Sequence, residues 1–195
     1  MREKEIKKYT KLNELAEPNG IVIFGGSEDK SIPIGELRQA FALESNIYNR
    51  SFKNISINDA VKLYDECIAS LAPETILIHI GDTDKHFFTE TPAAFDNKFR
   101  ELIAHIKSHN KNCRIAIMSL RNYNNNSQTE QINKHLKYIA DSEMCEYCDI
   151  ANKKLWNPKS TKDAISFIYS IGFVYPLKKR QSLHDIVKIL FCYEA

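Results

Sequence analysis

Apolar residues recur along the chain in two alternating patterns. Short runs of adjacent apolar residues, many of them β-branched, indicate buried strands, whereas apolar residues three or four positions apart in a charged background indicate amphipathic helices. The runs predict strands near 21–24, 46–48, 75–80, 114–120 and 145–150. The helical spacing predicts helices over about 4–16, 33–43, 57–71 and 183–193, with two more that begin near 92 and 127.

This alternation sets the expected fold class. A strand, a helix and a second strand in succession form a right-handed crossover between parallel neighbours. The chain is therefore expected to form a three-layer α/β/α sandwich of the flavodoxin-like kind, with a parallel sheet of about five strands covered on both faces. Residues 151–181 are left open, because the segment ISFIYSIGFVYP suits a strand, a helix or an ordered loop.

Length and composition indicate one domain of ordinary globular character. The 195 residues are expected to form a single domain over 1–195, with a helix within 1–18 that packs on it or flanks it. The segment MREKEIKKY lacks the apolar stretch of a signal peptide, and no run is apolar enough to span a membrane. The five cysteines are too sparse for a disulfide-stapled secreted domain, so a cytoplasmic location is expected. A formal charge of +2 does not indicate a nucleic-acid partner.

Polar residues follow the predicted strands, at the edge of the sheet where open parallel sheets bind ligands. Ser27 follows the first strand in GGSEDK, and the segments NRSFKN and GDTDKH follow the second and third. A serine between a strand and a helix presents an exposed hydroxyl close to backbone N–H groups, which favour developing negative charge. Because Gly-Gly-Ser also occurs in ordinary turns, this loop alone leaves a structural and a catalytic interpretation open.

Four short blocks, taken in order, make the sequence similar to the SGNH (GDSL-type) hydrolases, which include esterases and lipases. That family has Gly-Asp-Ser, an Asn-Arg-Gly-like segment, Gly-x-Asn-Asp and Asp-x-x-His where this chain has Gly25-Gly26-Ser27, Asn49-Arg50-Ser51, Gly81-Asp82-Thr83-Asp84 and Gln181-Ser182-Leu183-His184. The region 115–150 also resembles the family, so the resemblance covers nearly all of 20–195. It implies the same three-layer fold.

The resemblance also implies roles for individual residues. Ser27 stands where the family has its nucleophile, and His184 where it has its base. The implied oxyanion hole consists of the backbone N–H groups of Ser27 and Ser51 together with the side chain of Thr83.

Two departures from the family bear on the chemistry. Thr83 replaces an asparagine that donates to the oxyanion, and losing one such donor costs about 100- to 1,000-fold in rate. Gln181 replaces the aspartate that orients the histidine, and an aspartate-to-amide change in a serine protease triad costs about 10,000-fold. Asn49 and Asp84 are expected at the cleft, and His86 either there or on the surface.

Two functions are compatible with these residues. The first is a serine hydrolase without a cofactor that cleaves a small ester, including acetyl esters of carbohydrates, by a Ser-His dyad or an incomplete triad. The alternative is an SGNH-like protein with weak or no catalysis that uses the cleft to bind a ligand or a partner. A flavodoxin-like phosphate or nucleotide module at Gly25-Gly26-Ser27 is disfavoured, because no fuller phosphate-binding fingerprint is present.

The remaining cysteines and histidines predict no metal site. Cys145 and Cys148 form a CxxC, but residues three apart on a strand point to opposite faces and cannot readily share a metal. His79 lies in an apolar strand and is interpreted as a buried histidine with a hydrogen-bond partner. Three further histidines fall on predicted helices and are interpreted as solvent-facing or interfacial: His105, His109 and His135.

Overall fold

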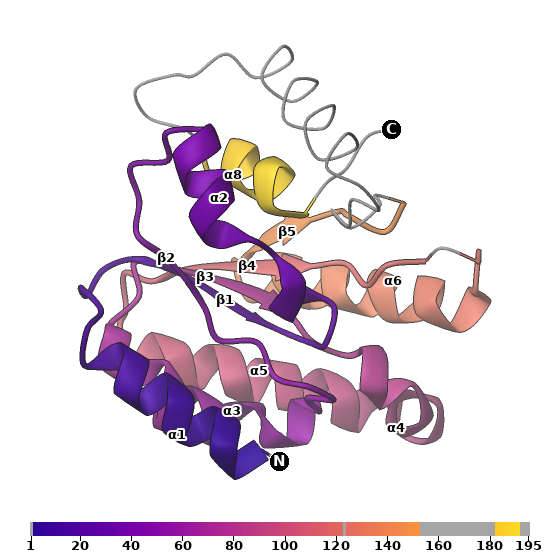
Figure 1. Cartoon of the computed structure of the whole chain (residues 1–195). Coiled ribbons are helices and arrows are strands. Elements are labelled where there is room, and N and C mark those ends of the chain that lie inside the picture. The colour runs from indigo at the N-terminus through magenta and orange to yellow at the C-terminus, as the bar shows by residue number, and fades with distance from the viewer. Residues whose placement is uncertain (1, 123, 153–181, 192–195) are drawn as a thin grey trace.

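The computed structural model describes residues 2–122, 124–152 and 182–191, and its centre is a parallel sheet (Figure 1). The strand order is β2-β1-β3-β4-β5, and every described pair of neighbours is parallel. The predicted fold class and number of strands are thus confirmed. The strands are β1 (Ile21–Gly25), β2 (Ile47–Asn49), β3 (Thr75–His79), β4 (Arg114–Met118) and β5 (Glu146–Cys148).

Helices cover both faces of the sheet, which is the middle layer in Figure 1. The helices α1, α3, α5 and α6 share a buried cluster with one face, and α2 and α8 share a second cluster with the other. Their bounds are α1 (Arg2–Asn13), α2 (Ile34–Ala40), α3 (Ile57–Cys67), α4 (Lys85–Glu90), α5 (Pro92–His109), α6 (Ser127–Ser142) and α8 (Leu183–Phe191). Short 3-10 helices lie at η1 (Asp29–Ser31), η2 (Ala69–Leu71) and η3 (Asp82–Asp84).

The two clusters arise from the alternation of side chains along each strand. On β1, Val22 and Phe24 face α1, α3 and α5, while Ile21 and Ile23 face α2 and α8. Because both faces are covered, a strand of five apolar or small residues is buried along its whole length. The same alternation separates the two cysteines of the CxxC, since Cys145 packs against the first cluster and Cys148 against the second.

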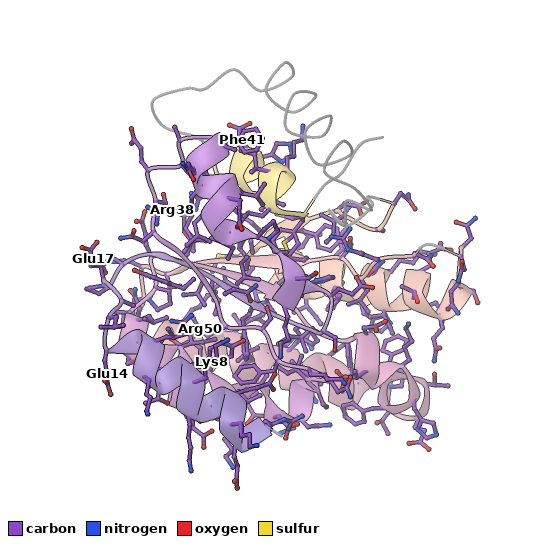
Figure 2. All side chains as sticks on the ribbon, in the orientation of Figure 1. Lys8, Glu14, Glu17, Arg38, Phe41 and Arg50 are labelled. Carbon is purple, nitrogen blue, oxygen red and sulfur yellow. The ribbon has the colours of Figure 1, made fainter. Side chains whose placement is uncertain are left out.

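A buried arginine holds the first helix on the sheet. The Arg50 guanidinium donates two hydrogen bonds to Asn13 Oδ1 (2.9 and 2.7 Å) and lies 5.2 Å and 5.6 Å from the ring centres of Tyr9 and Tyr48. Figure 2 shows Arg50 between α1 and the sheet. The Tyr9 hydroxyl donates to the Ser51 carbonyl (2.5 Å), and burial raises the pKa of Tyr9 to about 12. The helix predicted near the amino terminus therefore packs on the main core.

Several elements differ from the predicted ones in their ends, and one helix was not predicted. The helix predicted over 57–71 ends at Cys67 and continues as η2, which stops where Ala72 adopts a left-handed conformation (φ 42°). Helix α6 begins at Ser127, as predicted, and its cap is Asn126, whose side chain accepts the N–H of Thr129 (3.0 Å). Helix α4 was not predicted, because it has only six residues. Within the described residues, no helix has both the length and the apolar character needed to cross a membrane.

One amide side chain fixes the point where the chain leaves β4. Asn133 on α6 is buried, and its Oδ1 accepts the N–H of Leu120 (2.7 Å) while its Nδ2 donates to the carbonyl of Leu120 (2.9 Å). We expect Asn133→Ala to lower the free energy of unfolding by about 2–4 kcal/mol, because two buried backbone groups lose their partners. Urea denaturation measures this, with the exposed Lys137→Ala on the same helix as control, expected within about 0.5 kcal/mol of wild type. Equal effects of the two variants would contradict this role of Asn133.

Candidate active site

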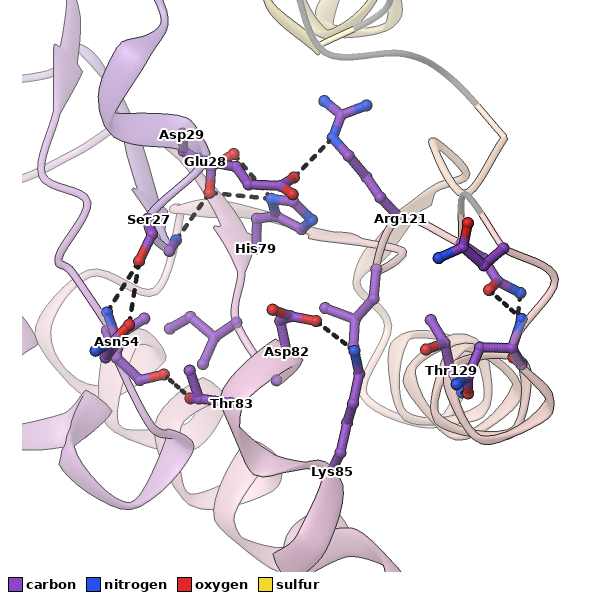
Figure 3. A pocket seen from close by; sticks show the side chains of 18 residues that line it. Ser27, Glu28, Asp29, Asn54, His79, Asp82, Thr83, Lys85, Arg121 and Thr129 are labelled. Carbon is purple, nitrogen blue, oxygen red and sulfur yellow. Dashed lines mark hydrogen bonds and ion pairs between the residues drawn. The ribbon is translucent and has the colours of Figure 1, made fainter.

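A pocket lies beyond the carboxyl ends of the strands (Figure 3). Its lining includes Ser27 after β1, Asn54 after β2, Thr83 after β3 and Arg121 after β4. The carboxyl ends of parallel strands meet at one edge of a sheet, which is why loops so distant in sequence share one cavity. The cavity measures about 260 Å³, which suits a small ligand group rather than a long chain.

The hydroxyl of Ser27 lies in this pocket and is held by one neighbour. Ser27 is exposed, and its Oγ accepts the backbone N–H of Asn54 (3.1 Å) and donates to Asn54 Oδ1 (3.4 Å), as Figure 3 shows. Ser27 is thus at the carboxyl edge of the first strand, as predicted. Sequence reasoning missed Asn54, which has a left-handed backbone (φ 53°) and lies five residues beyond the end of β2.

A buried carboxylate and an imidazole form a pair beside Ser27. Asp29 is fully buried, accepts the N–H of Gly26 (2.8 Å), and lies 2.9 and 3.0 Å from His79 Nδ1 through its two oxygens. His79 is 8% exposed and lines the pocket. When Nδ1 donates to a carboxylate, the lone pair of a neutral imidazole is on Nε2, the arrangement that a general base requires. The prediction that His79 is buried with a partner is confirmed.

Glycines permit this close approach. A Cβ on Gly25 would lie 2.0 Å from Asp29 Oδ2, so any larger residue at 25 would displace the carboxylate. A Cβ on Gly26 would meet no atom within 4 Å, so this site has room for a side chain. The carboxylate of Asp29, three residues after Gly26, accepts the Gly26 N–H and so stabilises the loop that carries Ser27.

Two of the three residues expected to form the oxyanion hole, Ser51 and Thr83, have other partners. The backbone N–H of Ser51 donates to Asn49 Oδ1 (3.0 Å), and Ser51 is fully buried. The Thr83 hydroxyl lines the pocket but donates to the carbonyl of Ile55. Within the described residues, the pocket therefore includes Ser27 and Thr83 of the expected set and leaves Ser51 beneath it.

Structural comparison identifies the fold. A Streptococcus pneumonia protein whose name refers to platelet activating factor aligns with a TM-score of 0.67 at 19% identity, over 96% of this chain and 90% of the other. The SGNH-hydrolase family esterase AlinE4 aligns with a TM-score of 0.52 at 12% identity, over 82% and 95%. A variant of Axe2, an acetyl-xylooligosaccharide esterase from Geobacillus, aligns with a TM-score of 0.56 at 14% identity, over 85% and 98%. The chain has the fold of the SGNH hydrolases. No family model matches the sequence, and no curated protein does.

In this SGNH fold, α8 runs in the same direction as the strands, and this places His184 away from Ser27. Leu183, at the start of α8, lines a hollow together with Ile21, Thr75 and Arg114, which are the first residues of β1, β3 and β4. At the other end of the helix, the Phe191 ring lies 6.0 Å from the His79 ring, and its carbonyl accepts a hydrogen bond from Arg121 (2.8 Å).

The expected convergence of Ser27 and His184 is therefore not observed. His184 is the second residue of α8, is exposed, and lies toward the amino ends of the strands, whereas Ser27 lies beyond the carboxyl end of β1. The sequence pattern could not reveal this, because a histidine at a helix start gives no information on the direction in which that helix crosses the sheet. Gln181 lies outside the described residues.

Asn49 and Asp84, which were expected at the cleft, have structural contacts instead, and His86, expected at the cleft or on the surface, lies on the surface. Asn49 Nδ2 donates to the carbonyl of Asp29 (2.7 Å) beneath the serine loop. Asp84 is buried and accepts the Ser56 hydroxyl (2.5 Å) and the N–H of Ile57 (3.0 Å), so it braces the start of α3. His86 extends to the surface, with 86% of its side chain exposed and an ion pair with Glu90 (3.3 Å).

Charged side chains that the sequence reasoning did not select also line the pocket. Arg121 Nε lies 3.4 Å from Glu28 Oε2, and Lys85 Nζ lies 2.7 Å from Asp82 Oδ1. Figure 3 shows these two pairs among the side chains that line the pocket. Because cations and anions both occur there, the pocket carries no strong preference for one sign of ligand charge.

The carboxyl of Asp84 makes stability depend on pH. Burial raises its pKa above the ordinary value, against the opposing effect of its hydrogen bonds with Ser56 and Ile57. The folded state then binds a proton more tightly than the unfolded state, so the contribution of this group to the free energy of unfolding is largest below about pH 4 and declines as the pH rises through the raised pKa. We expect the stability of wild type relative to Asp84→Asn to be greater near pH 4 than near pH 7.

Urea denaturation of the two proteins across this pH range measures the effect. Asp141→Asn, which removes an exposed carboxyl on α6, serves as a control for the loss of one negative charge. A difference between wild type and Asp84→Asn that stays constant with pH, or grows as the pH rises, would contradict the effect of burial.

Proposed function

We propose that the chain is an ester hydrolase of the SGNH type, with Ser27 as its nucleophile in the pocket beyond β1 and β3. The observation that carries the proposal is that Ser27 shares this pocket with an imidazole held by a buried carboxylate, His79 with Asp29. The fold supports it, since structures with the same fold include an SGNH-hydrolase family esterase and an acetyl-xylooligosaccharide esterase.

In this proposal His79 takes the role that the sequence resemblance assigned to His184. The Ser27 hydroxyl leaves Asn54 Oδ1, attacks the carbonyl carbon of the ester, and gives its proton to His79 Nε2, directly or through one water. His79 then protonates the departing alcohol, and the acyl group remains on Ser27. A water activated by His79 hydrolyses this acyl-enzyme, and Asp29 stabilises the imidazolium in both steps.

The oxyanion requires donors near Ser27 Oγ. The backbone N–H of Asn54 already points at that oxygen (3.1 Å), so it is placed to donate to the carbonyl oxygen once the carbonyl carbon is bonded to Ser27. The backbone N–H of Ser27 is the second proposed donor. The Thr83 hydroxyl can donate to the oxyanion only after it breaks its hydrogen bond with the Ile55 carbonyl. The Ser51 N–H donates to Asn49 Oδ1 and is not a proposed donor to the substrate.

The size of the pocket favours a short acyl group, and we propose a small ester such as an acetylated carbohydrate as the substrate class. No cofactor takes part in these steps. Cys67, Cys113 and Cys145 are free thiols, which fits the proposed cytoplasmic location.

A second candidate function is ligand or partner binding by a catalytically weak SGNH-like protein. The hydroxyls of Ser27 and Thr83 both donate to other groups of the chain, Asn54 Oδ1 and the Ile55 carbonyl. This favours the binding function, because neither hydroxyl is hydrogen-bonded to a base. In that case the pocket would bind a small polar ligand, and Ser27 would contribute a hydrogen bond rather than a nucleophile.

Two substitutions test the hydrolase. We expect wild type to hydrolyse short-chain aryl esters and Ser27→Ala to abolish the reaction, because no other atom can form the acyl-enzyme. His79→Gln should lower kcat by about 100- to 10,000-fold, the typical contribution of a general base. Steady-state kinetics measure both effects, and a serine-reactive fluorophosphonate should label wild type but not Ser27→Ala.

The matched control is His135→Ala, which removes the histidine of a second His–Asp pair, with Asp96 at 3.0 Å, outside the pocket. It should retain the wild-type kcat. An esterase rate unchanged in Ser27→Ala would favour the binding function. A rate lost in His184→Ala and retained in His79→Gln would show that His184 is the base after all.

A further inference from the structure

Three metal-ligating side chains meet on the surface between α3 and α5, away from the pocket. Asp65 lies on α3, and His105 and His109 lie one turn apart on α5. One ligand atom from each residue lies within 4.8 Å of the other two. His105 Nε2 is 2.6 Å and His109 Nε2 is 3.8 Å from the same oxygen, Asp65 Oδ1.

The backbone of α5 sets the orientation of one imidazole. His109 Nδ1 lies 3.0 Å from the carbonyl of His105, so this nitrogen carries the proton and donates it. In the neutral form of His109 the lone pair is then on Nε2, the nitrogen that lies 3.8 Å from Asp65 Oδ1. A histidine whose second ring nitrogen donates to a backbone carbonyl is the usual arrangement of a metal ligand in proteins.

A buried tyrosine packs against the imidazole rings of both His105 and His109. Tyr64, 1% exposed, meets the His105 ring edge-on at 5.9 Å and the His109 ring at 5.6 Å between ring centres. The side chains of His105, His109 and Asp65 remain 29%, 42% and 46% exposed, so an ion from solvent can reach them. The two imidazole rings are thus packed against Tyr64 on one side and open to solvent on the other.

We propose that Asp65, His105 and His109 form a binding site for zinc or a similar divalent transition metal. Ligands about 2.0–2.1 Å from a tetrahedral zinc ion lie about 3.3 Å from one another, a value between the two nitrogen–oxygen distances of 2.6 and 3.8 Å. His105 Nε2 donates to Asp65 Oδ1 in the absence of metal, so zinc binding also requires this proton to leave Nε2, either for Nδ1 or for solvent. Two imidazoles and one carboxylate leave the fourth position to water, and the metal links α3 to α5 on the face of the sheet opposite α8.

Part of this site could be predicted from the sequence. His105 and His109 were interpreted as solvent-facing or interfacial, and their spacing of four places them on one side of a helix. Asp65 lies 40 residues from His105, and only the packing of α3 against α5 brings it to them. The cysteines considered for metal binding, Cys145 and Cys148, pack on opposite faces of the sheet instead.

Zinc titration tests the proposal. Isothermal titration calorimetry at pH 7.5, with metal-stripped protein that carries no polyhistidine tag, should give binding of one zinc ion that is lost or weakened by more than about tenfold in His109→Ala and in Asp65→Ala. Zinc at about 100 times its Kd should raise Tm by about 5 °C in wild type and not in His109→Ala. Binding should weaken at pH 5.5, because protonated imidazoles cannot coordinate a metal.

The control is His86→Ala, which removes an exposed histidine that also has an acidic partner four residues away, and it should bind zinc as wild type does. Magnesium should give no Tm shift, because it prefers oxygen ligands. Since the substituted side chains are half-exposed, circular dichroism should show that His109→Ala is folded. Zinc binding that is absent in wild type, or unchanged in both His109→Ala and Asp65→Ala, would mean that the three residues form only a surface ion pair.

Discussion

The buried carboxylate of Asp29 is the group on which the candidate active site depends. It binds the turn after β1 through the N–H of Gly26 and the end of β3 through Nδ1 of His79, so it fixes two strand ends relative to each other. Removing a carboxylate from water costs several kcal/mol unless hydrogen bonds compensate, and here a backbone N–H and an imidazole do so. Gly25 has no side chain because the carboxylate occupies that space. The position of Ser27 follows from this arrangement.

The packing of α8 determines which histidine can reach the pocket. The helix crosses one face of the sheet in the direction of the strands, so its last residues meet His79 and Arg121 while its first residues meet the beginnings of β1, β3 and β4. The histidine that lines the pocket is therefore His79, at the end of β3, and not His184. The face opposite α8 carries α3 and α5, and the three metal-ligating side chains lie on that side. One candidate site thus lies at the carboxyl edge of the sheet and the other on the helices that cover one face, so the two can be tested separately.

The resemblance in sequence and the geometry of the site both place Ser27 at the pocket, and they differ on the residues around it. Ser27 is where the motif places it, because it lies only two residues beyond the end of β1 and its position is set locally by that strand. The partners of a nucleophile come from other loops, and their positions depend on hydrogen bonds that a motif does not record. Ser51 donates to Asn49, Asp84 braces α3, and Asn54, which no motif marks, holds the serine hydroxyl.

The sequence by itself determined the layers of this protein. Strands formed by apolar runs such as 21–24 and 75–80 are excluded from water only when both faces of the sheet are covered. The segments between them have the apolar spacing of amphipathic helices, which can cover those faces. Composition and periodicity were therefore enough to predict a parallel α/β/α sandwich. Only the tertiary structure decided which polar residues meet. Asp29 with His79, and Asp65 with His105, are 50 and 40 residues apart, and each contact depends on strand register, helix direction and side-chain packing. These are long-range properties, because burial rewards a pattern of apolar positions, whereas a hydrogen bond requires two particular atoms to lie within about 3 Å of each other.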